Sequence, residues 1–171
     1  MTRKTDYSPG RTLVTPLQEL AHDHRELNDL LIAVHEAIAR IEKGASKLED
    51  ELHEMTDGLE AFREELLEHF AREQEGAFPF LATRLPKART RVDELIAQHD
   101  RIAESLDAVI QDLGKPGHTT STSSWSQALA RFESLYAEHS KSELAFFNDI
   151  TAALEGDPDA TKQLRDLLAE P

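Results

Sequence analysis

Apolar residues recur at alternating intervals of three and four along most of the chain, the spacing that places them on one face of an α-helix. The pattern begins after Thr15 and Pro16, a capping hydroxyl followed by a proline that suits the first helical turn. It continues through Leu17, Leu20, His24, Leu27, Leu31, Val34, Ile38 and Ile41. We therefore predict a helix that is closed by Gly44, with His24 on its buried face.

The same rhythm recurs in further segments and predicts more long helices. The second helix is expected from Ser46 to about Thr83, with an irregularity near Gly76 and Pro79. Its inward stripe reads Leu52, Met55, Leu59, Phe62, Leu66, His69, Glu73 and Gly76. The third helix is expected to begin at Pro86. Its stripe reads Val92, Leu95, His99, Ile102, Leu106, Val109 and Leu113.

A fourth helix follows a loop that we expect over residues 114–124, where glycine, proline and small hydroxyl residues gather. The stripe of this helix reads Leu129, Phe132, Tyr136, His139, Glu143, Phe146, Ile150 and Ala153. Gly156-Asp157-Pro158 then interrupts the chain. The leucines beyond it predict a short amphipathic helix that packs on the outside: Leu164, Leu167 and Leu168.

These elements predict an all-α fold, because long amphipathic helices joined by short loops favour an up-down-up-down four-helix bundle. We expect the bundle over residues 15–155 and the tail helix over residues 156–171. Residues 1–14 are polar, contain three basic residues and lack periodicity, so we interpret them as an N-terminal arm.

Composition narrows the classes of function. The chain has 171 residues, enough for one domain, and its 39% hydrophobic and 30% charged content is ordinary for a soluble helical protein. A net charge of −14 disfavours nucleic-acid and anionic-membrane partners. Cysteine is absent, so any metal must be held by histidine and carboxylate. Neither a secretory signal nor a transmembrane run is evident, and we expect a cytoplasmic protein.

Polar residues interrupt the apolar stripes at one level of the predicted bundle. At a rise of about 1.5 Å per residue, all of them fall in one layer: His24, His69, Glu73, His99, His139 and Glu143. A single histidine in a stripe is usually a core residue with its hydrogen bonds made. A buried carboxylate, however, is costly unless a cation or a hydrogen-bond donor neutralises it. No Lys or Arg shares these stripes, so the set favours a metal site.

Imidazole and carboxylate suit iron, manganese or zinc when thiolate is missing. Two ions fit better than one, because Glu73 and Glu143 can each bridge a pair of metals and leave two histidines for each ion. We pair His24 with His69 and His99 with His139. The remaining histidines and two nearby glutamates are expected on the surface: His22, His35, His53, His118, Glu65 and Glu68.

Four short segments carry this polar layer: Asp23-His24-Arg25-Glu26-Leu27, His69-Phe70-Ala71-Arg72-Glu73, Gln98-His99-Asp100 and His139-Ser140-Lys141-Ser142-Glu143. Together they resemble the hemerythrin family, also described as HHE cation-binding domains, over about residues 16–154. The resemblance implies two iron ions, Fe²⁺ or Fe³⁺, with bridging carboxylates and an oxo or hydroxo bridge. It also implies a small diatomic or peroxide molecule as the partner.

The sequence departs from the oxygen-carrying members of that family. Those carriers have two histidines one turn apart on the third helix, whereas here Leu95 and Ala103 stand one turn either side of His99. They also use an aspartate one residue further along the fourth helix, where this chain has Leu144. The resemblance is closer to a four-histidine, glutamate-bridged branch that includes domains linked to iron sensing. We interpret Tyr136 as a core residue; the alternatives are that it fills the vacant ligand position or forms a hydrogen bond with a bound ligand.

The leading hypothesis is a di-iron protein that binds or senses oxygen, peroxide, nitric oxide or iron. The second is a di-iron enzyme acting on small reactive oxygen or nitrogen species. A ferritin-like carboxylate protein is disfavoured, since only Glu19-Leu20-Ala21-His22 matches its Glu-x-x-His spacing and His22 lies off the stripe. The remaining alternative is a metal-free bundle whose polar layer sets helix register.

Overall fold

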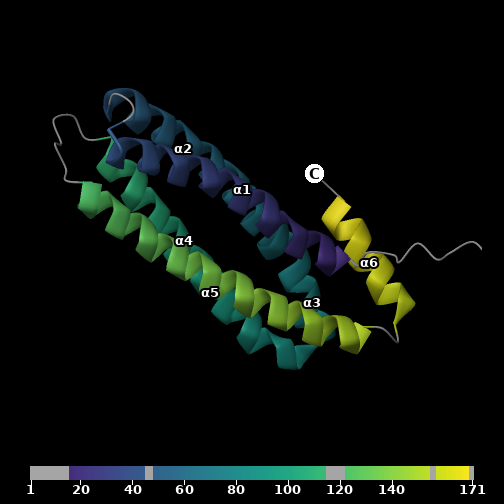
Figure 1. The fold of residues 1–171 in the computed structure, drawn as a ribbon. Helices are drawn as coiled ribbons and strands as arrows, with labels where there is room; N and C mark the ends of the chain where they lie inside the picture. Colours follow the sequence, from purple (N-terminus) through teal and green to yellow (C-terminus); the bar gives the residue numbers. More distant parts are fainter. Residues whose placement is uncertain (1–15, 45–47, 115–121, 155–156, 170–171) are drawn as a thin grey trace, which may run out of the picture.

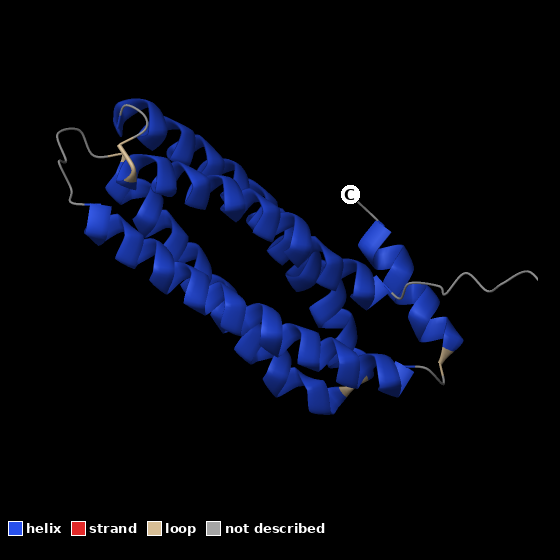
Figure 2. Cartoon of the chain, viewed as in Figure 1, coloured by secondary structure: helices blue, strands red, loops and turns tan. Residues whose placement is uncertain are grey.

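The computed structural model describes residues 16–44, 48–114, 122–154 and 157–169, and the secondary structure in these ranges is helical (Figures 1 and 2). The expected N-terminal arm, the capping residue Ser46 and the loop residue His118 lie outside the described residues. The side chain of His22 is not described either. Within the described ranges, none of the helices combines the length and apolarity needed to cross a membrane.

The helices follow the predicted order. They are α1 (Pro16–Glu42), α2 (Leu48–Ala71), a π-helical segment (Arg72–Ala77), α3 (Phe78–Arg84), a 3₁₀ turn (Pro86–Ala88), α4 (Arg89–Leu113), α5 (Thr122–Leu154) and α6 (Pro158–Ala169). The predicted second helix corresponds to α2, the π segment and α3 in succession. The predicted loop over residues 114–124 is too long, because α5 already begins at Thr122.

The packing confirms the four-helix bundle. Helix α1 packs against α2 and α5, and α4 packs against the same two helices, so the four form a closed ring of neighbours. Figure 1 shows these long helices side by side. Gly44 ends α1 as predicted: its φ of +63° lies in the left-handed region that favours glycine, and its N–H donates to the carbonyl of Ile41 at 3.0 Å.

The predicted irregularity in the second helix is a π-helical turn. The N–H of Phe78 donates to the carbonyl of Glu73, five residues back rather than the four of an α-helix. The wider turn directly precedes Pro79, whose ring would crowd the carbonyl four residues earlier in a regular helix. It also shifts the inward stripe by one position. Ala77 is fully buried, whereas Gly76, which we had expected in the stripe, is only half-buried.

The apolar core falls into two clusters with the polar layer between them. The cluster toward the α1–α2 connection includes Leu27, Leu66, Ile102 and Tyr136. The cluster toward α6 includes Leu20, Ala77, Leu95 and Phe146. Helices α1, α4 and α5 contribute to both clusters, whereas α2 contributes to the first and its continuation, the π segment and α3, contributes to the second. The layer residues are therefore packed between apolar side chains on both sides.

Helix α6 lies beside the ring of four helices and packs against α1, α5 and the π segment. It is less peripheral than its sequence suggests, because Ala160 and Leu164 are buried in the second apolar cluster. The carboxylate of Asp157 accepts the N–H of Ala160 at 3.0 Å and also pairs with Arg84. The N–H of Ala160 has no acceptor within the first turn of the helix, and the Asp157 side chain supplies one. The pair with Arg84 also joins α6 to α3.

The burial of Leu164 gives a direct test of how α6 contributes to stability. Leu164→Ala is expected to lower the free energy of unfolding by about 2 to 4 kcal/mol, because it leaves a cavity in the second cluster. Leu167→Ala, on the same helix but 40% exposed, is expected to cost less than about 1 kcal/mol. Urea denaturation of both variants measures the difference. Equal costs would contradict the packing of α6 into the core.

Candidate metal centre

The structure brings all of the predicted layer residues together in the interior of the bundle. His24 comes from α1, His69 from α2, Glu73 from the π segment, and His99 from α4. His139 and Glu143 lie one turn apart on α5. All are buried, and Glu73, His139 and Glu143 are fully inaccessible to solvent.

The four imidazoles form two pairs. The ring centroids of His24 and His69 are 4.7 Å apart, and those of His99 and His139 are also 4.7 Å apart. The two rings of each pair meet edge to face, at interplanar angles of 74° and 75°. These are the pairs expected from the sequence.

Each carboxylate presents one oxygen to each histidine pair. Glu143 Oε1 lies 3.0 Å from His24 Nε2, and its Oε2 lies 2.9 Å from His139 Nε2. Glu73 Oε1 lies 3.6 Å from His69 Nε2, and its Oε2 lies 3.2 Å from His99 Nε2. Both carboxylates therefore span the space between the two pairs, which is the arrangement of a bridging group.

The donor atoms are close enough to hold cations. One atom each from Glu73, His99, His139 and Glu143 lie within 4.8 Å of one another, as do one atom each from His24, His69 and Glu143. Glu143 belongs to both groups. In addition, His139 Nε2 and Glu143 Oε2 are buried without a hydrogen bond. Such atoms are costly in an apolar interior, and a cation among them would satisfy their lone pairs.

A buried carboxylate elsewhere in the bundle is neutralised differently. Glu51 is 4% exposed and accepts two hydrogen bonds from Nε of Arg40, at 2.9 and 3.0 Å. This pairing was not predicted, since the sequence stripe pointed to Leu52, which is only half-buried. The guanidinium reaches Glu51 because Arg40 lies near the end of α1, whereas Glu73 and Glu143 face imidazoles in the middle of the bundle.

Burial and close neighbours shift the pKa values of His99 and Glu143. Desolvation lowers the pKa of His99 from 6.5 to about 2, and the proximity of His139 adds to the effect. His99 is therefore a neutral imidazole, the form that offers a lone pair to a metal. Burial by itself raises the pKa of Glu143, but the close approach of His139 and His24 outweighs it and holds that pKa below its usual range.

Hydrogen bonds on the outer side of the rings fix their orientation. His24 Nδ1 lies 3.0 Å from Tyr136 Oη and 3.1 Å from Ser140 Oγ. The Ser140 hydroxyl donates to the Tyr136 carbonyl, so its oxygen can accept from the imidazole. Tyr136 is the core residue that we predicted, and its hydroxyl bonds to a ring of the layer.

Two glutamines complete this outer arrangement. Gln98 Oε1 lies 3.1 Å from His139 Nδ1, and Gln74 Nε2 lies 2.8 Å from His99 Nδ1. Sequence reasoning assigned no role to either glutamine or to Ser140. The only available signal was adjacency, because each of the three is the immediate chain neighbour of a layer residue.

Aromatic rings close the site toward the apolar clusters. The ring of Phe70 stacks on His99 with centroids 3.7 Å apart and an interplanar angle of 6°. Phe78 lies against the same imidazole at 5.7 Å, and Phe70 meets His139 edge to face at 5.6 Å. These contacts exclude water from one side of the layer and keep the rings from rotating.

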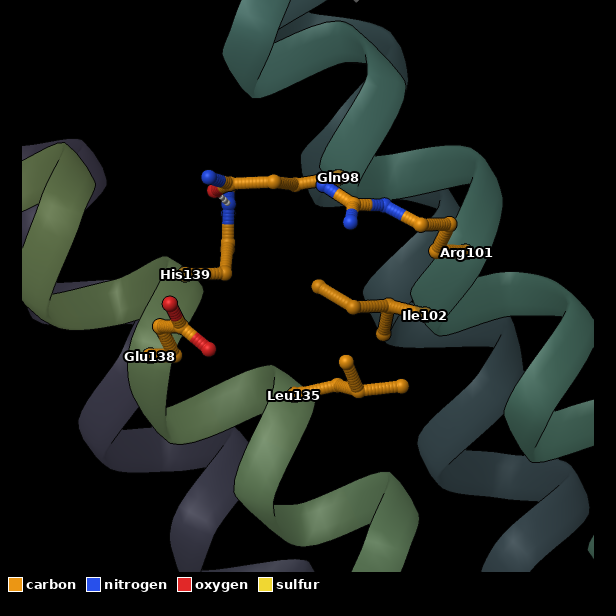
Figure 3. A pocket seen from close by; sticks show the side chains of 6 residues that line it. All are labelled: Gln98, Arg101, Ile102, Leu135, Glu138 and His139. Atoms are coloured by element: carbon orange, nitrogen blue, oxygen red, sulfur yellow. Dashed lines mark hydrogen bonds between the residues drawn. The ribbon is translucent and has the colours of Figure 1, made fainter.

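A small pocket between α4 and α5 reaches the layer from outside (Figure 3). It has a volume of about 40 Å³ and is lined by Gln98, Arg101, Ile102, Leu135, Glu138 and His139. In Figure 3 the side chain of Gln98 extends from α4 to the imidazole of His139 on α5. A space of this size accommodates a water-sized molecule.

The side chains expected outside the site are exposed where the structure describes them. His35, His53, Glu65 and Glu68 lie on the surface, and His35 pairs there with Glu133. Leu95 is buried and Leu144 is 50% exposed, so neither position offers a polar group to the layer.

Comparison with known proteins gives one family. The sequence model described as the hemerythrin HHE cation-binding domain matches residues 15–147. Searches of curated proteins and of solved structures found no significant match. The matched range contains every residue of the polar layer.

The lowered pKa of His99 predicts a pH dependence of stability in the metal-free protein. Below pH 6.5 the unfolded chain binds a proton at this residue that the folded protein does not, so stability falls as the pH falls. Between pH 7 and pH 5, protonation of His99 in the unfolded chain should lower the free energy of unfolding by about 2 kcal/mol. Urea denaturation at a series of pH values measures it.

The matched variants for this experiment are His99→Gln and His53→Gln. His99→Gln should flatten the dependence on pH, because the titrating group is gone. His53→Gln should leave it unchanged, since the His53 side chain is 80% exposed. An unaltered pH dependence in His99→Gln would contradict the lowered pKa.

Proposed function

This chain belongs to the hemerythrin family of HHE cation-binding domains, and from that premise we propose a di-iron protein that binds or senses oxygen, peroxide, nitric oxide or iron. The coarser statement, that it is a metal-binding protein, follows from the family and from the buried His/Glu cluster. The identity of the metal and of the small ligand is part of the proposal.

One observation carries the proposal: both buried carboxylates divide their oxygens between the same two histidine pairs. Glu143 faces His24 and His139, and Glu73 faces His69 and His99. A single ion would use only one of the two groups of donors. Two cations use both groups.

The donor set assigns a role to each residue. His24 and His69 would hold one cation, and His99 and His139 the other. Glu73 and Glu143 would bridge them. The set is rich in nitrogen and lacks thiolate, which suits iron and also permits manganese or zinc. Iron is the choice that the family resemblance favours.

A pair of iron ions, when bound, supplies open coordination positions and a reversible change of oxidation state. The chain determines what can reach them. Phe70 and Phe78 wall the layer on one side, and the pocket beside His139 holds about 40 Å³. Pockets for organic substrates are typically several hundred cubic ångströms. These dimensions support a diatomic molecule or peroxide as the ligand.

In oxygen carriers the third helix has a second histidine one turn away, whereas Leu95 and Ala103 stand one turn either side of His99 in this chain, and Leu144 stands where carriers have an aspartate. Leu95 is buried and Leu144 faces solvent. Each cation in our assignment has two imidazoles and the shared carboxylates. This difference favours sensing over reversible oxygen transport.

The alternative function is a di-iron enzyme that acts on small reactive oxygen or nitrogen species. The observation in its favour is the same pocket, because His139 is one of the residues that line it. Peroxide consumption by the iron-loaded protein distinguishes the two. Multiple turnovers that are lost in Glu73→Ala support the enzyme, whereas a single stoichiometric change supports the sensor.

Metal content tests the proposal directly. Protein loaded with Fe²⁺ under anaerobic conditions and then desalted is expected to retain two irons per chain, measured by elemental analysis. Glu143→Ala should retain at most one, because it removes the carboxylate common to both donor groups. Glu138→Ala is the matched control on α5, since Glu138 is exposed, and it should retain both irons.

Removal of the metal should also lower thermal stability. A ligand present at 100 times its dissociation constant stabilises the folded state by about 2.7 kcal/mol. For a chain of this size, that corresponds to a fall in Tm of about 5 to 10 °C on chelation. Calorimetry with and without a chelator measures the shift. An unchanged Tm together with an absence of bound metal would favour the metal-free bundle.

A further inference from the structure

In two histidines of the layer, Nδ1 lies against a glutamine side chain. One glutamine presents its carbonyl oxygen to the ring and the other presents its amide nitrogen. His139 Nδ1 meets the carbonyl oxygen of Gln98 at 3.1 Å, whereas His99 Nδ1 meets the amide nitrogen of Gln74 at 2.8 Å. A carbonyl oxygen only accepts hydrogen bonds and an amide nitrogen only donates them. The two imidazoles are therefore held as different tautomers.

His139 is held in the tautomer that a cation requires. Its Nδ1–H donates to Gln98, which leaves Nε2 bare and facing Glu143 Oε2 at 2.9 Å. A cation between these two atoms could accept a lone pair from each. Both atoms are indeed buried and without a hydrogen bond. The Gln98–His139 unit therefore has the orientation of a metal ligand before any metal arrives.

His99 is held in the other tautomer. Because its Nδ1 accepts from Gln74, the proton lies on Nε2, which faces Glu73 Oε2 at 3.2 Å. The π turn makes this possible, since Glu73 and Gln74 are consecutive residues of the π segment and meet the two nitrogens of the same ring. A metal at Nε2 would have to displace this proton to Nδ1.

We propose that Gln74 and Gln98 are positioning residues for the metal centre, and that the Gln74 amide turns over by 180° when a cation binds. Gln98 keeps the Nε2 lone pair of His139 directed inward. Gln74 bonds to His99 in both states, first as a donor to bare Nδ1 and then as an acceptor from Nδ1–H. This inference rests on the proposed function, because it concerns the same cations.

The chemistry of the side chain explains why an amide stands at position 74. A carboxylate in place of Gln74 could only accept, so it would fix the metal-ready tautomer of His99 and set its bare Nε2 against Glu73 in the metal-free protein. A carboxamide pairs with either tautomer and adds no charge to a site that already holds two acids. Nδ1 of His99 can then be hydrogen-bonded in both the metal-free and the metal-bound state.

The tautomers can be read without any metal. The ¹⁵N shift of an imidazole nitrogen distinguishes a protonated atom from a bare one, so ¹⁵N NMR of the metal-free protein assigns each ring. We expect His139 to be protonated at Nδ1 and His99 at Nε2. After addition of Zn²⁺, a diamagnetic probe, both should be protonated at Nδ1. Protonation of His99 at Nδ1 before Zn²⁺ is added would overturn the turnover of Gln74.

Variants separate positioning from packing. Gln74→Glu should move the proton of metal-free His99 to Nδ1, and Gln98→Glu should leave His139 as it is. Gln98→Ala should weaken Zn²⁺ binding by about 10- to 100-fold, with affinity restored in Gln98→Glu. Gln111→Ala is the matched control, because Gln111 is an exposed glutamine on the same helix. Competition with a chromophoric chelator measures these affinities.

The outcomes for the two proposals are distinct. Wild-type affinity in Gln98→Ala, or a loss that Gln98→Glu does not restore, would overturn the positioning role while leaving the metal site intact. If the wild-type protein takes up no Zn²⁺ or Fe²⁺, the proposed function fails. The tautomers of the metal-free protein would still decide whether the two amides orient His99 and His139 as we infer.

Discussion

The two carboxylates buried at the centre of the bundle impose the constraint on which the rest of the structure depends. Glu73 and Glu143 are fully inaccessible to solvent and are faced by four imidazoles. Such a layer is tolerated only if its groups meet at short distance, since an isolated buried carboxylate is far more costly than a neutralised one. The apolar clusters on either side supply that alignment, because α1, α4, α5 and the continuous run from α2 through α3 each contribute to both of them.

Local departures from regular helix serve the same layer. The π turn places Glu73 and Gln74 on opposite sides of His99, and it is covered by α6, whose Leu168 lies 3.5 Å from the point where a Cβ on Gly76 would stand. On α5, His139 and Glu143 are one regular turn apart, and Ser140 and Tyr136 extend the arrangement to His24. Among the layer residues, Glu73 thus comes from the π segment and the others from α-helices, and glutamine partners orient His99 and His139.

Much of this architecture could be predicted from periodicity. Because a helix repeats every 3.6 residues, the apolar stripes gave the bundle and placed the six layer residues at one level. Other features depend on information that periodicity lacks. Because of the extra residue in the π turn, Ala77 rather than Gly76 is buried in the core. Because Glu51 pairs with Arg40, Glu51 rather than Leu52 is buried. Gln74 and Gln98 became visible only as contacts between helices, since amides on a half-buried face have no distinctive spacing.

The measurement that tests the central claim most directly is anomalous X-ray diffraction from crystals of the iron-loaded protein, recorded on both sides of the iron absorption edge. The account predicts two iron peaks inside the bundle, about 3 to 4 Å apart. One should lie beside His24 and His69, the other beside His99 and His139, with Glu73 and Glu143 reaching both. A single peak, or iron bound only at surface carboxylates, would contradict it.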